Sequence, residues 1–128
     1  MKNLFLIALV CAPLGAGCAA VAAGAVGGIV MTTEFTDAAT YVTHLNIDAK
    51  KVWPEAKNVL QDTTLDLLEV DDTIRVAKAK IDGATVTVSV EPYDIDKSTL
   101  LIKARKYGFP DGETARLVQE KIVRRLQP

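Results

Sequence analysis

The sequence predicts an α+β fold: a two-layer sandwich in which two helices cover one face of an antiparallel sheet of about five strands. Three observations predict it. Residues 84–92 alternate apolar and polar side chains at the two-residue period of a half-buried strand. Asp82-Gly83, just before them, is a strong hairpin signal. The segments after Asp48 and Asp111 repeat apolar residues at helical spacing. The expected order is β-α-β-β-β-β-α, after an N-terminal signal helix.

The other strands follow from shorter alternating runs. Residues 36–47 predict the first strand, with Tyr41, Thr43 and Leu45 toward the core and His44 on the other side. Residues 65–70 and 73–81 predict two strands around an acidic turn, and residues 98–106 predict the last one. Each strand of this meander has one apolar face, which favours a sheet with helices on one side only.

Aspartates mark the starts of both helices. Asp48 suits an N-cap for a helix that ends near residue 62, although Pro54 leaves two alternatives: a helix kinked at the proline, or a regular helix that begins there. Trp53 lies beside Val52, so we expect it to fill the interface between helix and sheet rather than bind a ligand. Asp111 is the expected cap of the last helix.

The N-terminus has the order of a secretory signal. Lys2 precedes an apolar run, and small residues then lead to Cys18. The segment Leu-Gly-Ala-Gly-Cys at 14–18 resembles the lipobox of bacterial prolipoproteins. The resemblance implies that a peptidase cuts before Cys18 and that the cysteine sulfur carries a diacylglycerol. The alternative is an uncleaved anchor, since residues 4–31 exceed the roughly 20 residues that cross a bilayer core, but Pro13 and the glycines would make it a poor helix.

These features divide the chain into three parts: a lipoprotein signal peptide at 1–17, a lipidated Gly/Ala-rich tether at 18–33 and a single α+β domain at 34–128. Resemblance to known lipoproteins also implies sorting to the periplasmic face of the outer membrane, because Ala19, and not aspartate, follows the cysteine. Cleavage would remove one of the 15 basic residues and none of the 16 acidic ones. Such a balance argues against a nucleic-acid partner.

No catalytic constellation stands out. The single histidine, His44, has no nucleophile or carboxylate that spacing would place beside it, so we expect no catalytic residue, metal or cofactor. Asp71-Asp72 and Asp94-x-Asp96 lack the pattern of a calcium loop and are explained by turns. A basic stripe would form if the strands at 73–81 and 98–106 expose the same face, from the residues Arg75, Lys78, Lys80, Lys103, Arg105 and Lys106. The predicted contact surface comprises Lys103, Arg105, Tyr107 and Phe109.

Several motifs together resemble a family of small bacterial lipoproteins defined by domain of unknown function 3568. They are the lipobox cysteine, the Gly/Ala-rich start, Val52-Trp53 after Asp48, the segment Val-Thr-Val-Ser-Val-Glu-Pro at 86–92, and Gly-Phe-Pro-Asp-Gly-Glu at 108–113. The resemblance implies the fold and the location, and it adds no activity, cofactor or site residue.

The expected function is that of a non-enzymatic envelope lipoprotein held to the membrane through Cys18. Its domain would bind an envelope protein or a glycan. The alternative is a carrier of lipid or a small molecule, because a helix packed on a curved sheet can enclose an apolar cavity. Val86, Val88, Val90, Leu100, Ile102 and Ala104 would line that cavity.

Overall fold

The computed structural model describes residues 29–36 and 39–127. In chain order, the elements are β1 (Val30–Thr36), β2 (Thr40–Leu45), α2 (Ala49–Thr63), β3 (Glu69–Asp71), β4 (Val76–Ile81), β5 (Ala84–Asp94), β6 (Lys97–Lys106), β7 (Phe109–Pro110) and α3 (Gly112–Leu126). The expected signal helix and most of the expected tether lie outside the described residues.

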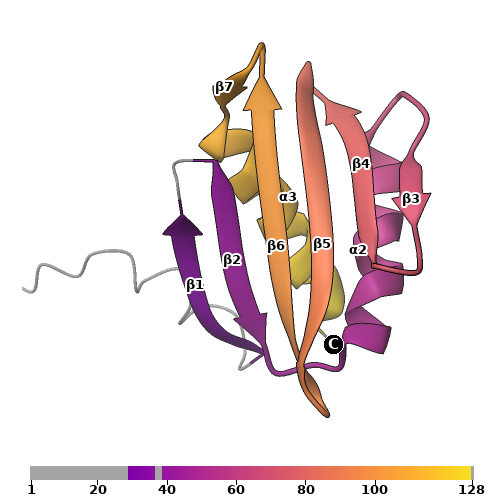
Figure 1. Cartoon of the computed structure of the whole chain (residues 1–128), viewed down its shortest axis with the longest axis vertical. Helices are drawn as coiled ribbons and strands as arrows, with labels where there is room; N and C mark the ends of the chain where they lie inside the picture. Colours follow the sequence, from indigo (N-terminus) through magenta and orange to yellow (C-terminus); the bar gives the residue numbers. More distant parts are fainter. Residues whose placement is uncertain (1–28, 37–38, 128) are drawn as a thin grey trace, which may run out of the picture.

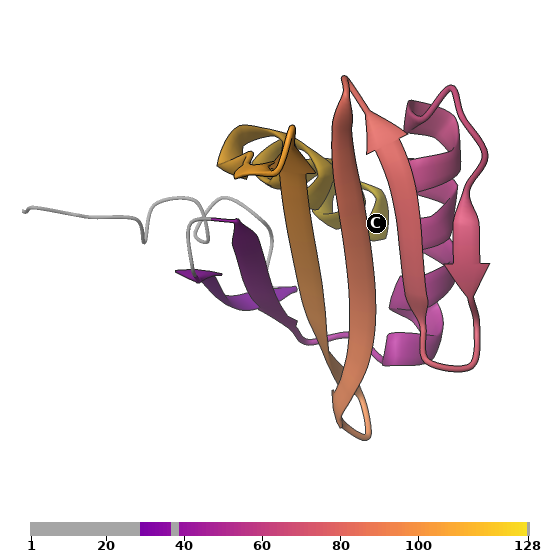
Figure 2. The same ribbon diagram turned by 45° about the horizontal axis from the view of Figure 1, so that its top comes forward.

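The strands form one antiparallel sheet in the order β1-β2-β6-β5-β4-β3, and β7 pairs with the end of β6. Both helices pack on the same side of this sheet, and its other side is bare of helices in the described part of the chain; Figures 1 and 2 show this arrangement. The predicted α+β sandwich with two helices on one face is therefore confirmed. We call the bare side the open face.

The sheet has seven strands, more than the expected number. The strand expected over residues 36–47 corresponds to β2, but its start was wrong, because Thr36 ends a separate strand, β1. β1 and β2 pair with each other from Thr36 opposite Thr40 to Val30 opposite Leu45. β1 also includes residues 30–33, which the sequence had assigned to the tether. The second unexpected strand, β7, has only two residues.

Side-chain capping fixes the start of each helix. The Asp48 carboxylate accepts a hydrogen bond from the Lys50 amide (2.9 Å), and the Asp111 carboxylate accepts one from the Thr114 amide (3.1 Å). Helix α2 runs from Ala49 through Pro54, so its start is set by the cap and not by the proline. Both predicted caps are confirmed.

The core lies between the helices and the inner side of the sheet. Alternate residues of β4, β5 and β6 are buried there, as the alternation of 84–92 predicted. Trp53 is 6% exposed in this interface, and its indole Nε1 donates a hydrogen bond to an Asp72 carboxylate oxygen (2.8 Å). The largest fully buried side chains include Leu45, Leu60, Leu100, Ile102 and Ile122. This packing leaves the open face as the large surface of the sheet that neither α2 nor α3 covers.

Candidate functional site

The register of the sheet brings four cations together on the open face. Lys103 on β6 lies opposite Thr87 on β5, which lies opposite Lys78 on β4. Two residues further along the strands, Arg105, Thr85 and Lys80 form a second row of the same kind. Because residues two apart on a strand share a face, both rows point to the same side. We call Lys78, Lys80, Lys103 and Arg105 the cation frame.

The cation frame is a rectangle of exposed charges. Its sides are about 7 Å along the strands and about 10 Å across them, from the usual rise and strand spacing. All four side chains are exposed, and none has an ion-pair partner among the residues that the structure describes. Glu69 on the edge strand β3 lies opposite Lys78 but forms no ion pair with it. The frame therefore presents four exposed positive charges to solvent beside one carboxylate.

Charge changes sign along the open face. Below the frame runs a half-buried aliphatic row with Val42, Leu101 and Val76. Glu34 and Asp71 lie on the two outer strands beside this row, opposite Val42 and Val76, and Glu91 lies one row further on, opposite Thr99. The four cations therefore gather where β6 ends and these three carboxylates lie nearer its start, where Lys97 begins the same strand on the same face. This uneven distribution of charge orients a charged partner.

The structure divides the predicted contact surface. Lys103 and Arg105 lie together on the open face, but Phe109 lies opposite Lys106, on the side of the sheet that carries the helices. Tyr107 and Gly108 form the turn between β6 and β7, with φ of 53° and 80°, as in a type I′ hairpin turn. The rings of Tyr107 and Phe109 are 85% and 73% exposed. They therefore border the frame at the tip of the sheet and are not part of it.

A hydrogen bond from Arg105 joins the β6–β7 turn to the cation frame. One of its guanidinium nitrogens donates a hydrogen bond to the Gly108 carbonyl oxygen (3.4 Å). Two other members of the predicted basic stripe lie elsewhere. Lys106 lies on the other side of β6, next to Arg105 in sequence, and Arg75 lies in the turn before β4. The sequence could not place them because the parity of each strand, once paired, decides which face a side chain joins.

His44 lies on the open face, as the sequence predicted. Its ring Nδ1 is 3.0 Å from the Thr99 hydroxyl, and its ring centroid is 5.3 Å from that of Tyr93. Neither neighbour is a carboxylate, the group that commonly orients a catalytic histidine. In residues 29–36 and 39–127, no three His, Cys, Asp or Glu side chains gather as metal ligands would.

The acidic pairs act in turns and in one small network. Asp71 accepts a hydrogen bond from the Thr73 amide (3.0 Å), and Asp94 accepts one from the Ile95 amide (2.8 Å). Asp72 accepts hydrogen bonds from the Lys57 ammonium (2.7 Å) and from the Trp53 indole. These two bonds, that of Lys57 above all, lower the pKa of the Asp72 carboxyl.

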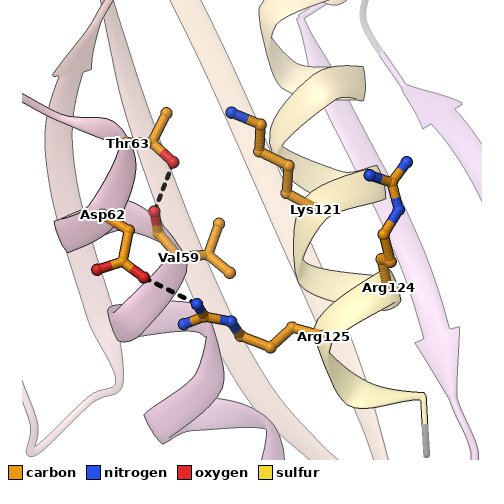
Figure 3. Close-up of a pocket in the computed structure, with 6 residues that line it drawn as sticks. All are labelled: Val59, Asp62, Thr63, Lys121, Arg124 and Arg125. Atoms are coloured by element: carbon orange, nitrogen blue, oxygen red, sulfur yellow. Dashed lines mark hydrogen bonds and ion pairs between the residues drawn. The ribbon is translucent and has the colours of Figure 1, made fainter.

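A groove between the two helices is the second surface with clustered charge. It has a volume of about 360 Å³ and is lined by Val59, Asp62, Thr63, Lys121, Arg124 and Arg125. Figure 3 shows that three of its polar side chains are already engaged, because Arg125 pairs with Asp62 (2.8 Å) and the Thr63 hydroxyl donates to the Val59 carbonyl (2.6 Å). No pattern in the sequence predicted this groove, which exists only because α2 and α3 are neighbours. Its internal ion pair makes it a weaker candidate than the cation frame.

The geometry defines the class of protein: a two-layer α+β domain with a filled core and an open sheet face that carries charged and polar side chains. Residues 2–125 match the family described as Protein of unknown function (DUF3568), and the chain belongs to that family. This confirms the resemblance to domain of unknown function 3568. No curated protein matches the chain.

Proposed function

We propose that this chain is a non-enzymatic bacterial envelope lipoprotein, held to the membrane by lipid on Cys18, whose open face binds an anionic envelope protein or glycan. The observation that carries the proposal is the cation frame. Four exposed cations, none with an ion-pair partner in the described part of the chain, form a surface whose field attracts and orients negative groups. The balanced charge of the whole chain, with a formal net charge of −1, does not favour nucleic acid as the partner.

The anchoring part of the proposal rests on the sequence before the domain. Residues 14–18 have the lipobox pattern, and Ala19 after the cysteine favours the periplasmic face of the outer membrane. No helix in the described part of the chain is long and apolar enough to cross a membrane. Residues between Cys18 and Ile29 can extend by at most about 40 Å, so lipid on Cys18 would keep the domain near the bilayer.

Metabolic labelling tests the anchor. Cells that express the wild-type chain or Cys18→Ala are grown with radioactive palmitate, and their membranes are then fractionated. We expect label and membrane retention for the wild type and loss of both for Cys18→Ala. Cys11→Ala is the matched control, since it removes the other cysteine of the chain and should leave the labelling unchanged. Label on Cys18→Ala would refute lipidation at this residue.

Charge reversal on the open face tests the binding part. Lys103→Glu/Arg105→Glu is compared with the wild type in affinity capture from detergent-solubilised envelopes. We expect the double variant to lose the captured partner, because it turns the most basic end of the face acidic. Lys121→Glu/Arg124→Glu on α3 is the matched control, with the same charge change on the helix side. Equal capture by the wild type and the frame variant would contradict the proposal.

The carrier hypothesis finds no support in the packing. The six side chains that would line its cavity, Val86, Val88, Val90, Leu100, Ile102 and Ala104, are 0–1% exposed within the shared core cluster. The groove between α2 and α3 is lined by none of them. A bound lipid would therefore need this part of the core to open, at the cost of well-packed contacts.

A further inference from the structure

We propose that the cation frame is a two-subsite phosphate site, which takes a glycan that carries two phosphate groups about 7 Å apart. This inference rests on the proposed function, because it uses the same open face and names the chemistry of its ligand. It goes further by assigning roles to two threonines, Thr85 and Thr87, that lie between the cations.

Each threonine forms the centre of a subsite. Thr87 lies between Lys103 and Lys78, and Thr85 lies between Arg105 and Lys80. Neighbouring strands are about 4.8 Å apart, a distance that lysine and arginine side chains can bridge from either side. Two cations can therefore converge above one threonine hydroxyl, and the same arrangement repeats two residues along the strand.

The number of donors per subsite favours phosphate over carboxylate. Two cationic groups and one hydroxyl provide donors from three directions, which matches the three acceptor oxygens of a phosphate monoester. A carboxylate has two oxygens. At Thr85 the cation pair includes Arg105, whose planar guanidinium suits the bidentate recognition of phosphate.

The surroundings favour a glycan over a bilayer or a protein. An anionic bilayer laid against the open face would also meet Glu34, Asp71 and Glu91, which would be repelled. The cation frame has threonines between its cations and contains no tryptophan or tyrosine, the side chains that supply much of the energy in protein interfaces. Tyr93, beside His44, lies away from the frame, toward the start of β6. A flat polar surface with exposed hydroxyls suits an extended, hydroxyl-rich chain.

Calorimetric titration of the purified full-length protein in detergent at low salt tests the site, with glucose 1,6-bisphosphate and glucose 6-phosphate as probes. We expect the bisphosphate to bind about tenfold more tightly, because the second phosphate binds intramolecularly once the first is held. Thr85→Val and Thr87→Val keep the shape of the side chain and the charge of the frame but remove the hydroxyl. Each variant should lower the affinity for the bisphosphate by about fivefold.

Controls separate the site from unspecific charge attraction. Thr40→Val, on the same face beside Lys103 but outside the space between the cations, should bind the bisphosphate as the wild type does. Equal affinity for the two sugars, or no effect of either threonine variant in correctly folded protein, would overturn the two-subsite assignment. Tighter binding to phosphatidylglycerol vesicles or to a polyglutamate peptide would overturn the choice of a glycan.

The two proposals fail differently. Loss of partner capture on charge reversal, together with equal binding of the two sugars, would leave the binding function standing and remove the phosphate assignment. Unchanged partner capture in the frame variant would contradict the proposed function itself.

Discussion

The N-cap of α3 offers a quantitative test of the fold. The Asp111 carboxylate accepts hydrogen bonds from the Thr114 amide (3.1 Å) and from the Thr114 hydroxyl (2.7 Å). Both hydrogen bonds lower the pKa of this carboxyl, and the bond from the hydroxyl has the larger effect. Asp111→Ala removes both acceptors from the start of a helix that packs on α2 and on the sheet.

The expected cost follows from this geometry. Loss of an aspartate N-cap lowers the free energy of unfolding by about 1 kcal/mol. For a domain of this size, that corresponds to a melting temperature lower by roughly 4–8 °C. Because the folded pKa of Asp111 is depressed, its contribution is fully present above the unfolded pKa of about 3.9 and is lost as the pH falls through the folded pKa. The two melting curves should therefore converge in acid.

Circular dichroism melts at pH 7 and in a series of acidic buffers measure both effects. Asp111→Asn is the matched control, because asparagine keeps an acceptor for the Thr114 amide and should stay close to the wild type at pH 7. Asp96→Ala, an exposed loop variant, should not change the melting temperature. An Asp111→Ala protein that melts with the wild type at pH 7, or a difference that persists unchanged at the lowest pH, would refute the reasoning.

Three further predictions concern the core, a turn and the tryptophan. Leu60→Ala should lower the free energy of unfolding by about 2–5 kcal/mol in denaturant titration, because Leu60 is fully buried and its loss leaves a cavity; a cost below 1 kcal/mol would contradict the packing. Tyr107→Asn should raise it by about 1 kcal/mol, since asparagine accepts the positive φ of this position, and a loss would show that the ring makes stabilising contacts. Trp53 fluorescence should change as the pH falls through the lowered pKa of Asp72, and Asp72→Asn should abolish that change while retaining the emission at neutral pH.

Much of the fold could be predicted because its signals are local. The buried face of a strand such as β5 can be recognised from the alternation of its own residues. The start of a helix such as α2 can be recognised from a single capping residue, Asp48, before an amphipathic stretch. β1 was missed for two reasons. Its residues follow a Gly/Ala-rich run, and the predicted first strand was begun at residue 36, where β1 ends. A period-two pattern cannot reveal that a chain reverses direction unless the turn has its own signal.

The site could be predicted only in part, because it depends on pairing. The spacing of Lys103 and Arg105 places them on one face of their own strand, and that prediction agrees with the structure. Their position across from Lys78 and Lys80 depends on the register of β4, β5 and β6, which the sequence does not specify directly. The β6–β7 turn was missed as well, since tyrosine is unusual at a position of positive φ.

The position of β1 also determines how the domain would carry mechanical load. Val30 begins β1 at one end of the sheet, opposite Leu45, whereas Arg105 lies near the opposite end, where β6 finishes. Tension between a lipid on Cys18 and a ligand on the cation frame would run along the strands. The backbone hydrogen bonds that join β1 to β2, and β2 to β6, would then be sheared together rather than peeled apart one after another. Strands in this geometry must slide before they separate, so the same sheet that displays the frame can also resist being pulled from the membrane side.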